Sequence, residues 1–126
     1  MFSMKRLFVE EWWDERVKAG SQVNLATTDD KALGVDYRGF GPWYRTISIA
    51  SLYADFQRFK WSHPKAHRLQ EDLTCSGFMM IFRSLLPEDG LETLYARITR
   101  EDGTKIRCRA VRFKDHDYYL RRVMAA

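Results

Sequence analysis

Cysteine is scarce in this chain of 126 residues, which contains only Cys75 and Cys108. Two cysteines so far apart in the sequence provide neither a disulfide framework nor a four-ligand zinc site. Long apolar runs are also missing, and the amino-terminal stretch MFSMKRLFVEE turns acidic too soon for a signal peptide. These absences lead us to expect a cytoplasmic protein that has no membrane partner.

Signatures of nucleotide and metal chemistry are equally sparse. The chain has no GxxxxGK(S/T) motif, which excludes an ATP-driven motor of that type, and Gly39 and Gly41 lack the spacing of a phosphate-binding loop. His63 and His67 have a spacing seen in zinc sites, but Pro64 interrupts the helix that would align them. We therefore expect no cofactor and no metal.

The residues that are present describe a small globular domain with an uneven charge. Apolar residues make up 45% of the chain and aromatic residues 14%, and the length suits a single domain spanning residues 1–126. The net charge of +4 is concentrated, since residues 97–114 contain seven Lys and Arg side chains against Glu101 and Asp102. This basic segment is the part of the sequence that says most about function.

Residues 94–113 are predicted to form a β-hairpin. The two arms alternate, and an Asp-Gly step between them marks a tight turn. A loop of residues 101–103, with Gly103 in the left-handed conformation and a G1 bulge, places apolar side chains opposite one another. The apolar pairs are Ile98 with Ile106, Ala96 with Cys108 and Leu94 with Ala110. A two-residue loop would pair Ile98 with Arg107 and mix the two faces.

The other face of the predicted hairpin is basic. It pairs Thr99 with Lys105, Arg97 with Arg107 and Tyr95 with Arg109. Like charges side by side destabilise a sheet, and a polyanion that neutralises them is a direct reason for a protein to keep them. This interpretation makes the hairpin a nucleic-acid-binding wing. An ordinary solvated basic face on an antiparallel sheet is the alternative.

Capping residues and apolar periodicity predict the helices. The first runs from a cap at Ser3 to about Ala19 and stops at Gly20; the second runs from a cap at Ser48 or Ser51 to about Trp61; the third covers Cys75 to Leu86, between a cap at Thr74 and Pro87; the last, YYLRRVM, follows a cap at Asp115. A short strand is expected between Trp43 and Ile49. Residues 21–43, rich in Gly, Asp, Asn and Thr, are predicted to be a long loop or insertion.

Each predicted helix has an apolar stripe that is expected to face the core. The stripes are Phe8, Val9, Trp12, Trp13 and Val17; Ile49, Leu52, Tyr53, Phe56 and Phe59; Phe78, Ile81, Phe82 and Leu85; and Tyr119, Leu120 and Val123. Arg58 and Lys60 are expected outside the second stripe. The carboxylates of the first helix, at positions 10, 11, 14 and 15, are interpreted as a solvated face.

The order helix, strand, helix, helix and basic hairpin is that of a winged helix. SLYADFQRF, followed by LTCSGFMMIFRSLLP and a basic hairpin, resembles the carboxy-terminal domains of phage and satellite-phage primase-helicases. The run from Phe78 to Pro87 is similar to the RFX-type winged helix, and FVEEWWDERVKAG resembles the segment that precedes this domain in phage primases. The match covers roughly Ala50 to Leu120 and leaves Ser21 to Pro42 without a clear equivalent.

The resemblance implies an α+β winged helix-turn-helix, with three or four helices and a small antiparallel β-hairpin wing. Because these domains bind the replication origin in satellite phages, it implies a non-enzymatic protein that binds double-stranded DNA at an origin or another specific site in phage or mobile-element replication. Replication proteins or a second copy of the chain are further implied partners. The candidate DNA-binding residues are Thr74, Ser76, Arg83, Arg97, Arg100, Lys105, Arg107, Arg109 and Arg112.

Two other functions stay open. Winged helices also dock on other proteins, and the four tryptophans are candidates for an exposed aromatic patch. A small nuclease would use a carboxylate such as Glu11, Asp14 or Asp115. Against the nuclease, the sequence shows no nucleophile with its base and no metal-ligand cluster.

Overall fold

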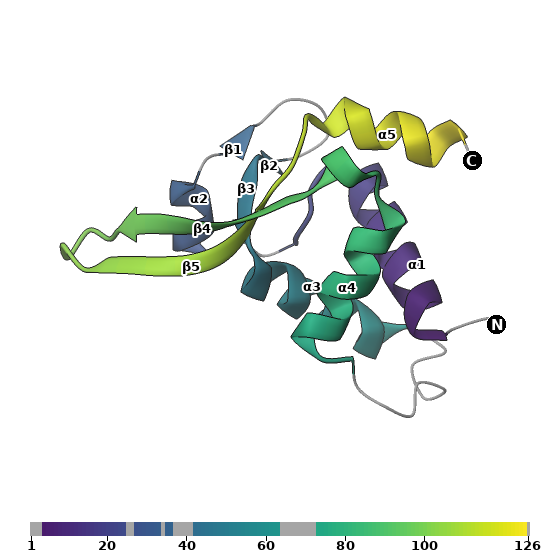
Figure 1. The fold of residues 1–126 in the computed structure, drawn as a ribbon, viewed down its shortest axis with the longest axis horizontal. Coiled ribbons are helices and arrows are strands. Elements are labelled where there is room, and N and C mark those ends of the chain that lie inside the picture. Colours follow the sequence, from purple (N-terminus) through teal and green to yellow (C-terminus); the bar gives the residue numbers. More distant parts are fainter. Residues whose placement is uncertain (1–3, 25–26, 34, 37–41, 64–72, 126) are drawn as a thin grey trace.

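The computed structural model describes residues 4–24, 27–33, 35–36, 42–63 and 73–125, which form an α+β fold as expected (Figure 1). The elements are α1 (Met4–Ala19), α2 (Thr28–Ala32), β1 (Val35–Asp36), β2 (Trp43–Tyr44), β3 (Thr46–Ser48), α3 (Ile49–Ser62), α4 (Cys75–Leu85), a 3-10 turn (Glu88–Gly90), β4 (Glu92–Thr99), β5 (Lys105–Arg112) and α5 (His116–Ala125). Helices α1, α3, α4 and α5 gather at one end, and the β4–β5 hairpin projects away from them (Figure 1).

The main sheet is antiparallel and has the strand order β3-β5-β4. Its hairpin has the predicted register, with Arg97 opposite Arg107 and Ile98 opposite Ile106. The predicted turn is also confirmed, because Gly103 has a φ of 85° and its N–H donates to the Arg100 carbonyl at 2.9 Å. Only glycine adopts this left-handed conformation without strain, so Gly103 determines which residues face one another.

The core is built around the two adjacent tryptophans of α1. Trp12 packs edge-on against Phe78 and Phe82 of α4, and Trp13 stacks on Phe113 at a centroid distance of 5.6 Å. Trp12, Trp13 and Trp43 are buried, at 0%, 4% and 1% exposure, whereas Trp61 is 67% exposed. The idea of an exposed patch of four tryptophans is therefore wrong, since three of them form the core.

Helix ends follow the predicted caps at most positions. The φ of Gly20 is 80°, and this residue ends α1. The Ser48 hydroxyl accepts the Ser51 N–H and caps α3, so Ser48 rather than Ser51 is the cap. Thr74 caps α4 by accepting the Gly77 N–H at 3.1 Å. The proposed cap at Ser3 lies outside the described residues.

The segment predicted to be a long loop, residues 21–43, contains regular structure. It holds α2 and β1, and its polar side chains bind the backbone of the core. Gln22, fully buried, donates to the Tyr44 carbonyl at 2.6 Å and accepts the Tyr44 N–H at 2.9 Å. The loop prediction was wrong here because hydrogen bonds from polar side chains fix the segment to the core. The segment has no apolar periodicity that could have predicted this.

A buried carboxylate anchors α2 to the start of α3. Asp30 has 0% exposure and accepts hydrogen bonds from the Ser48 N–H at 3.0 Å, the Thr27 hydroxyl at 2.8 Å and the Ser51 hydroxyl at 2.5 Å. Burial alone would raise the pKa of Asp30, but these hydrogen bonds outweigh it and lower the pKa below its ordinary value. Asp30 therefore remains ionised inside the protein.

Two further charged residues of α3 are buried. Asp55 is 2% exposed and accepts the Trp12 indole N–H at 2.8 Å and the Asn24 N–H at 2.9 Å. Lys60 was expected outside the apolar stripe, but it is 3% exposed, with its ammonium 4.7 Å from the Trp61 ring. Its long aliphatic stem lets a lysine be covered by neighbouring side chains.

Replacing the anchor should destabilise the fold. Asp30→Asn swaps one acceptor oxygen for a donor and leaves the buried Ser51 hydroxyl without this acceptor, so we expect the free energy of unfolding to fall by about 2–3 kcal/mol. Urea denaturation measures this loss. Asp117→Asn, at an exposed carboxylate of α5, is the matched control and should change little.

The same variant should alter the response to acid. The folded-state pKa of Asp30 is lowered, so its contribution is present at neutral pH and is lost as the pH falls through that pKa. Stability measured from neutral to acidic pH should therefore fall less steeply in Asp30→Asn than in wild type. Equal slopes would contradict the assigned role of this carboxylate.

Candidate nucleic-acid interface

One face of the hairpin carries exposed cations. Strand alternation directs Arg97 of β4 and Lys105, Arg107 and Arg109 of β5 to this face, and all four side chains are exposed. The opposite face carries Ala96, Ile98 and Ala110, which are buried. We call the surface formed by Tyr95, Arg97, Lys105, Arg107 and Arg109 the basic face.

The described residues do not neutralise the basic face. Arg97 lies directly opposite Arg107, an arrangement in which the two side chains repel each other. Within the part of the chain that the structure describes, Arg97, Lys105 and Arg109 have no carboxylate partner. The Arg107 guanidinium lies 4.3 Å from the centroid of the Tyr95 ring, a cation–π contact that orients the arginine but leaves its charge in place.

The positive surface continues from the hairpin onto α4. The Arg83 guanidinium donates to the Thr93 hydroxyl at 3.0 Å, which joins the helix to β4. A cavity of about 290 Å³ separates α4 from β5. Its lining consists of Ile49, Cys75, Ser76, Met79, Met80, Arg83 and Arg109. Burial raises the pKa of the Cys75 thiol more than Arg109 lowers it, so this cysteine remains protonated at neutral pH.

Most of the predicted DNA-binding residues are therefore brought together. Ser76 and Arg83 line the cavity beside Arg109, and the remaining members on this side lie along the basic face. Thr74 lies at the start of the same helix, where its hydroxyl caps α4. Two residues that were not among the candidate DNA-binding residues also belong here: Met80 is 74% exposed and Tyr95 is 59% exposed. The alternation of Tyr95 with Arg97, and the spacing of Met80 from Ser76, were signals that could have identified them.

Arg100 and Arg112 have different surroundings. The Arg100 guanidinium forms two contacts with the Asp29 carboxylate, at 2.9 Å and 3.3 Å, and these contacts join the end of β4 to α2. Arg112 lies 3.4 Å from Glu92, its cross-strand partner. By strand alternation, both arginines point to the side opposite the basic face. On that side each of them has a carboxylate partner.

Helix α2 covers the apolar face of the hairpin. The Arg100–Asp29 contact places α2 beside β4, and burial together with Asp30 and Asp29 raises the pKa of the Cys108 thiol. Cys108 belongs to the apolar face, so these carboxylates lie on the side opposite the basic face. The part of the chain predicted to be a loop is thus what supports the hairpin from behind (Figure 1).

No family model, curated protein or solved structure matches the chain. The resemblance to phage primase-helicases consequently stays a prediction from the sequence pattern. The described ranges contain no group of three His, Cys, Asp or Glu side chains placed to hold a metal ion. Their helices are also too short or too polar to cross a membrane.

The three carboxylates considered for a nuclease do not all lie together. Glu11 pairs with His63 at 2.6 Å, and Asp115 pairs with Arg45 at 2.9 Å at the start of α5. Asp14 lies on α1, beside Glu10. Glu11 and Asp14 line one cavity together with Lys18 and His63, and Asp115 lies outside its lining.

A charge reversal tests whether the basic face is strained. Arg97→Glu places a carboxylate opposite Arg107 and should raise the urea midpoint, because a cross-strand pair changes stability by roughly 0.2–1 kcal/mol. Salt should reduce this gain, since exposed charges are screened. Arg121→Glu, on the exposed side of α5, changes net charge equally and should give a smaller gain. If both variants raise the urea midpoint equally, the effect comes from the net charge and not from repulsion between Arg97 and Arg107.

Proposed function

We propose that this protein is a winged helix that binds double-stranded DNA at a replication origin or another specific site in phage or mobile-element replication. The observation that carries the proposal is the basic face, whose cations lack carboxylate partners among the described residues and continue onto α4. The element order α1, β3, α3, α4, β4, β5, with the sheet order β3-β5-β4, supports it, because winged helices connect their helices and strands in this way.

The two parts of this surface suit different contacts with DNA. Arg97, Lys105 and Arg107 extend along the hairpin, whose strands are about 26 Å long, and suit a row of phosphates. Arg83 and Arg109 both line the cavity beside α4. A guanidinium there can bind guanine through two hydrogen bonds, which is the commonest contact that specifies a base.

The surface favours a duplex over a single strand. Proteins that bind single strands stack bases on exposed aromatic rings. On the basic face the aromatic residue is Tyr95, and the Arg107 guanidinium already covers its ring. A surface that offers cations but no free aromatic ring for base stacking suits the phosphates of a duplex.

Fluorescence anisotropy with duplex, single-stranded and source-genome origin DNA tests the proposal across a salt series. Wild type should bind duplex most tightly, and tightest at an origin fragment. Arg97→Ala with Arg107→Ala should reduce the slope of log K against log salt by about 1.8, because each phosphate contact contributes about 0.9. Lys18→Ala with Arg121→Ala removes the same charge from α1 and α5 and is the control. Absence of binding by wild type at low salt would overturn the proposal.

Arg100 is expected to support the hairpin through Asp29 and not to contact DNA. Arg100→Asp should weaken binding because two carboxylates then repel α2 from the hairpin. Adding Asp29→Arg restores the ion pair in reverse and should restore affinity. Adding Asp117→Arg instead restores only the net charge and should not. If the reversed pair binds no better than this control, Arg100 contacts DNA directly, as the resemblance implied.

A further inference from the structure

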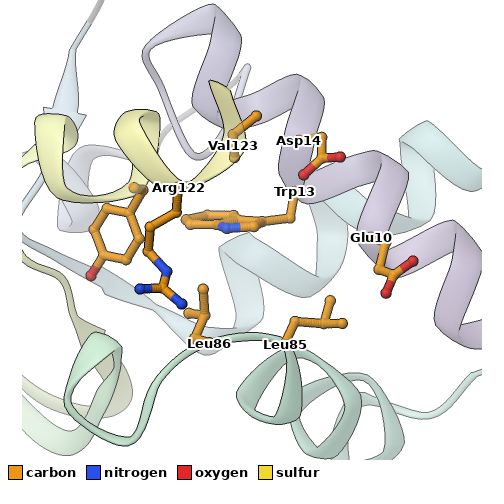
Figure 2. A pocket seen from close by; sticks show the side chains of 8 residues that line it. Glu10, Trp13, Asp14, Leu85, Leu86, Arg122 and Val123 are labelled. Atoms are coloured by element: carbon orange, nitrogen blue, oxygen red, sulfur yellow. The ribbon is translucent and has the colours of Figure 1, made fainter. Parts of the chain in front are cut away.

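A second concave surface lies between α1, α5 and the end of α4 (Figure 2). It encloses about 290 Å³. The lining residues are Glu10, Trp13, Asp14, Leu85, Leu86, Tyr119, Arg122 and Val123. Helices α1 and α5 lie at the end of the molecule away from the hairpin tip, so this cavity is separate from the basic face (Figure 1).

Apolar side chains form one part of the cavity wall and are firmly held, and charged side chains form the rest. Trp13 is 4% exposed and Tyr119 is 1% exposed, and both belong to the aromatic core. Leu85, Leu86 and Val123 are half-buried and complete the apolar walls. A cavity of this size accepts one large aliphatic or aromatic side chain, whose burial among these walls removes apolar surface from water.

Opposite charges line the two sides of the opening. Glu10 and Asp14 project from α1, and Arg122 projects from α5 across the Trp13 ring (Figure 2). Burial, together with Glu10 and Glu11, raises the pKa of Asp14, and Lys18 offsets only part of that rise. An additional cation beside α1 would therefore stabilise the ionised carboxylate. Arg122 would repel the same cation and so determines which side of the opening it occupies.

We propose that this cavity is a docking site for a segment of a partner protein in which a lysine or arginine neighbours a large apolar side chain. The apolar side chain enters between Trp13 and Leu86, and the cation contacts Asp14, because Glu10 already pairs with Arg6 at 3.5 Å. The opening is rimmed by exposed charged side chains, which allows a peptide chain to pass across it. The site does not depend on DNA binding, because α1 and α5 carry its polar groups.

Selection from a random-peptide phage library on the full chain tests this site. Enriched peptides should place Lys or Arg next to Leu, Ile, Phe or Trp, and their synthetic forms should perturb the Trp13 indole resonance. Asp14→Lys should weaken peptide affinity by roughly tenfold or more, since it places a positive charge where the cation of the peptide binds. Asp117→Lys, on α5 outside the cavity lining, should leave their affinity unchanged.

Three results would overturn the docking site. One is that no peptide is enriched, or that enriched peptides are acidic. Another is that Asp14→Lys and Asp117→Lys weaken binding equally while both variants unfold at the wild-type temperature. The third is a dimer in solution that Asp14→Lys dissociates, because a second copy of the chain would then occupy the cavity.

Discussion

The register of the β4–β5 hairpin is the constraint on which the rest of the structure depends. Gly103, with a φ of 85°, closes a loop that keeps Ile98 opposite Ile106 and Arg97 opposite Arg107. A shift by one residue would exchange the two faces along one strand. This separation creates an apolar face that must be covered and a basic face that has no internal counterion among the described residues. Helix α2 covers the apolar face, and a polyanion would neutralise the basic face.

Polar side chains fix the segment that contains α2 in place. This explains how the segment can cover the hairpin although it contains few apolar residues. Asp30 receives donors from Thr27, which caps α2, and from β3 and α3. Asp55 receives donors from α1 and from the chain beyond it. A buried carboxylate is costly unless its oxygens accept hydrogen bonds, which these do. The support of the hairpin is thus linked through α3 to the aromatic core around Trp12.

Local sequence signals predicted the hairpin and the helix ends. Features that depend on contacts between residues far apart in the sequence were not predicted. The Asp-Gly turn and alternation gave the register residue by residue, and it already implied that Arg112 faces Glu92, a contact that the candidate site overlooked. The structure of residues 21–24 and 27–33 was missed because Gln22 depends on Tyr44, and Asp30 on Ser48, although the capping box of Thr27 and Asp30 was a local signal for α2. Nothing in the local sequence pairs Arg100 with Asp29, because 71 positions separate them.

The concentration of positive charge on the hairpin also orients the molecule. Helix α1 carries four carboxylates and four cations, whereas the basic face projects on the hairpin at the other end (Figure 1). In the field of a polyanion such a charge distribution turns the hairpin inward and α1 outward. If the basic face binds DNA, as proposed, the cavity beside α1 then faces solvent. A basic residue of a partner would be attracted locally by Asp14 at this cavity, and the hairpin, whose charge has the same sign as that residue, would repel it.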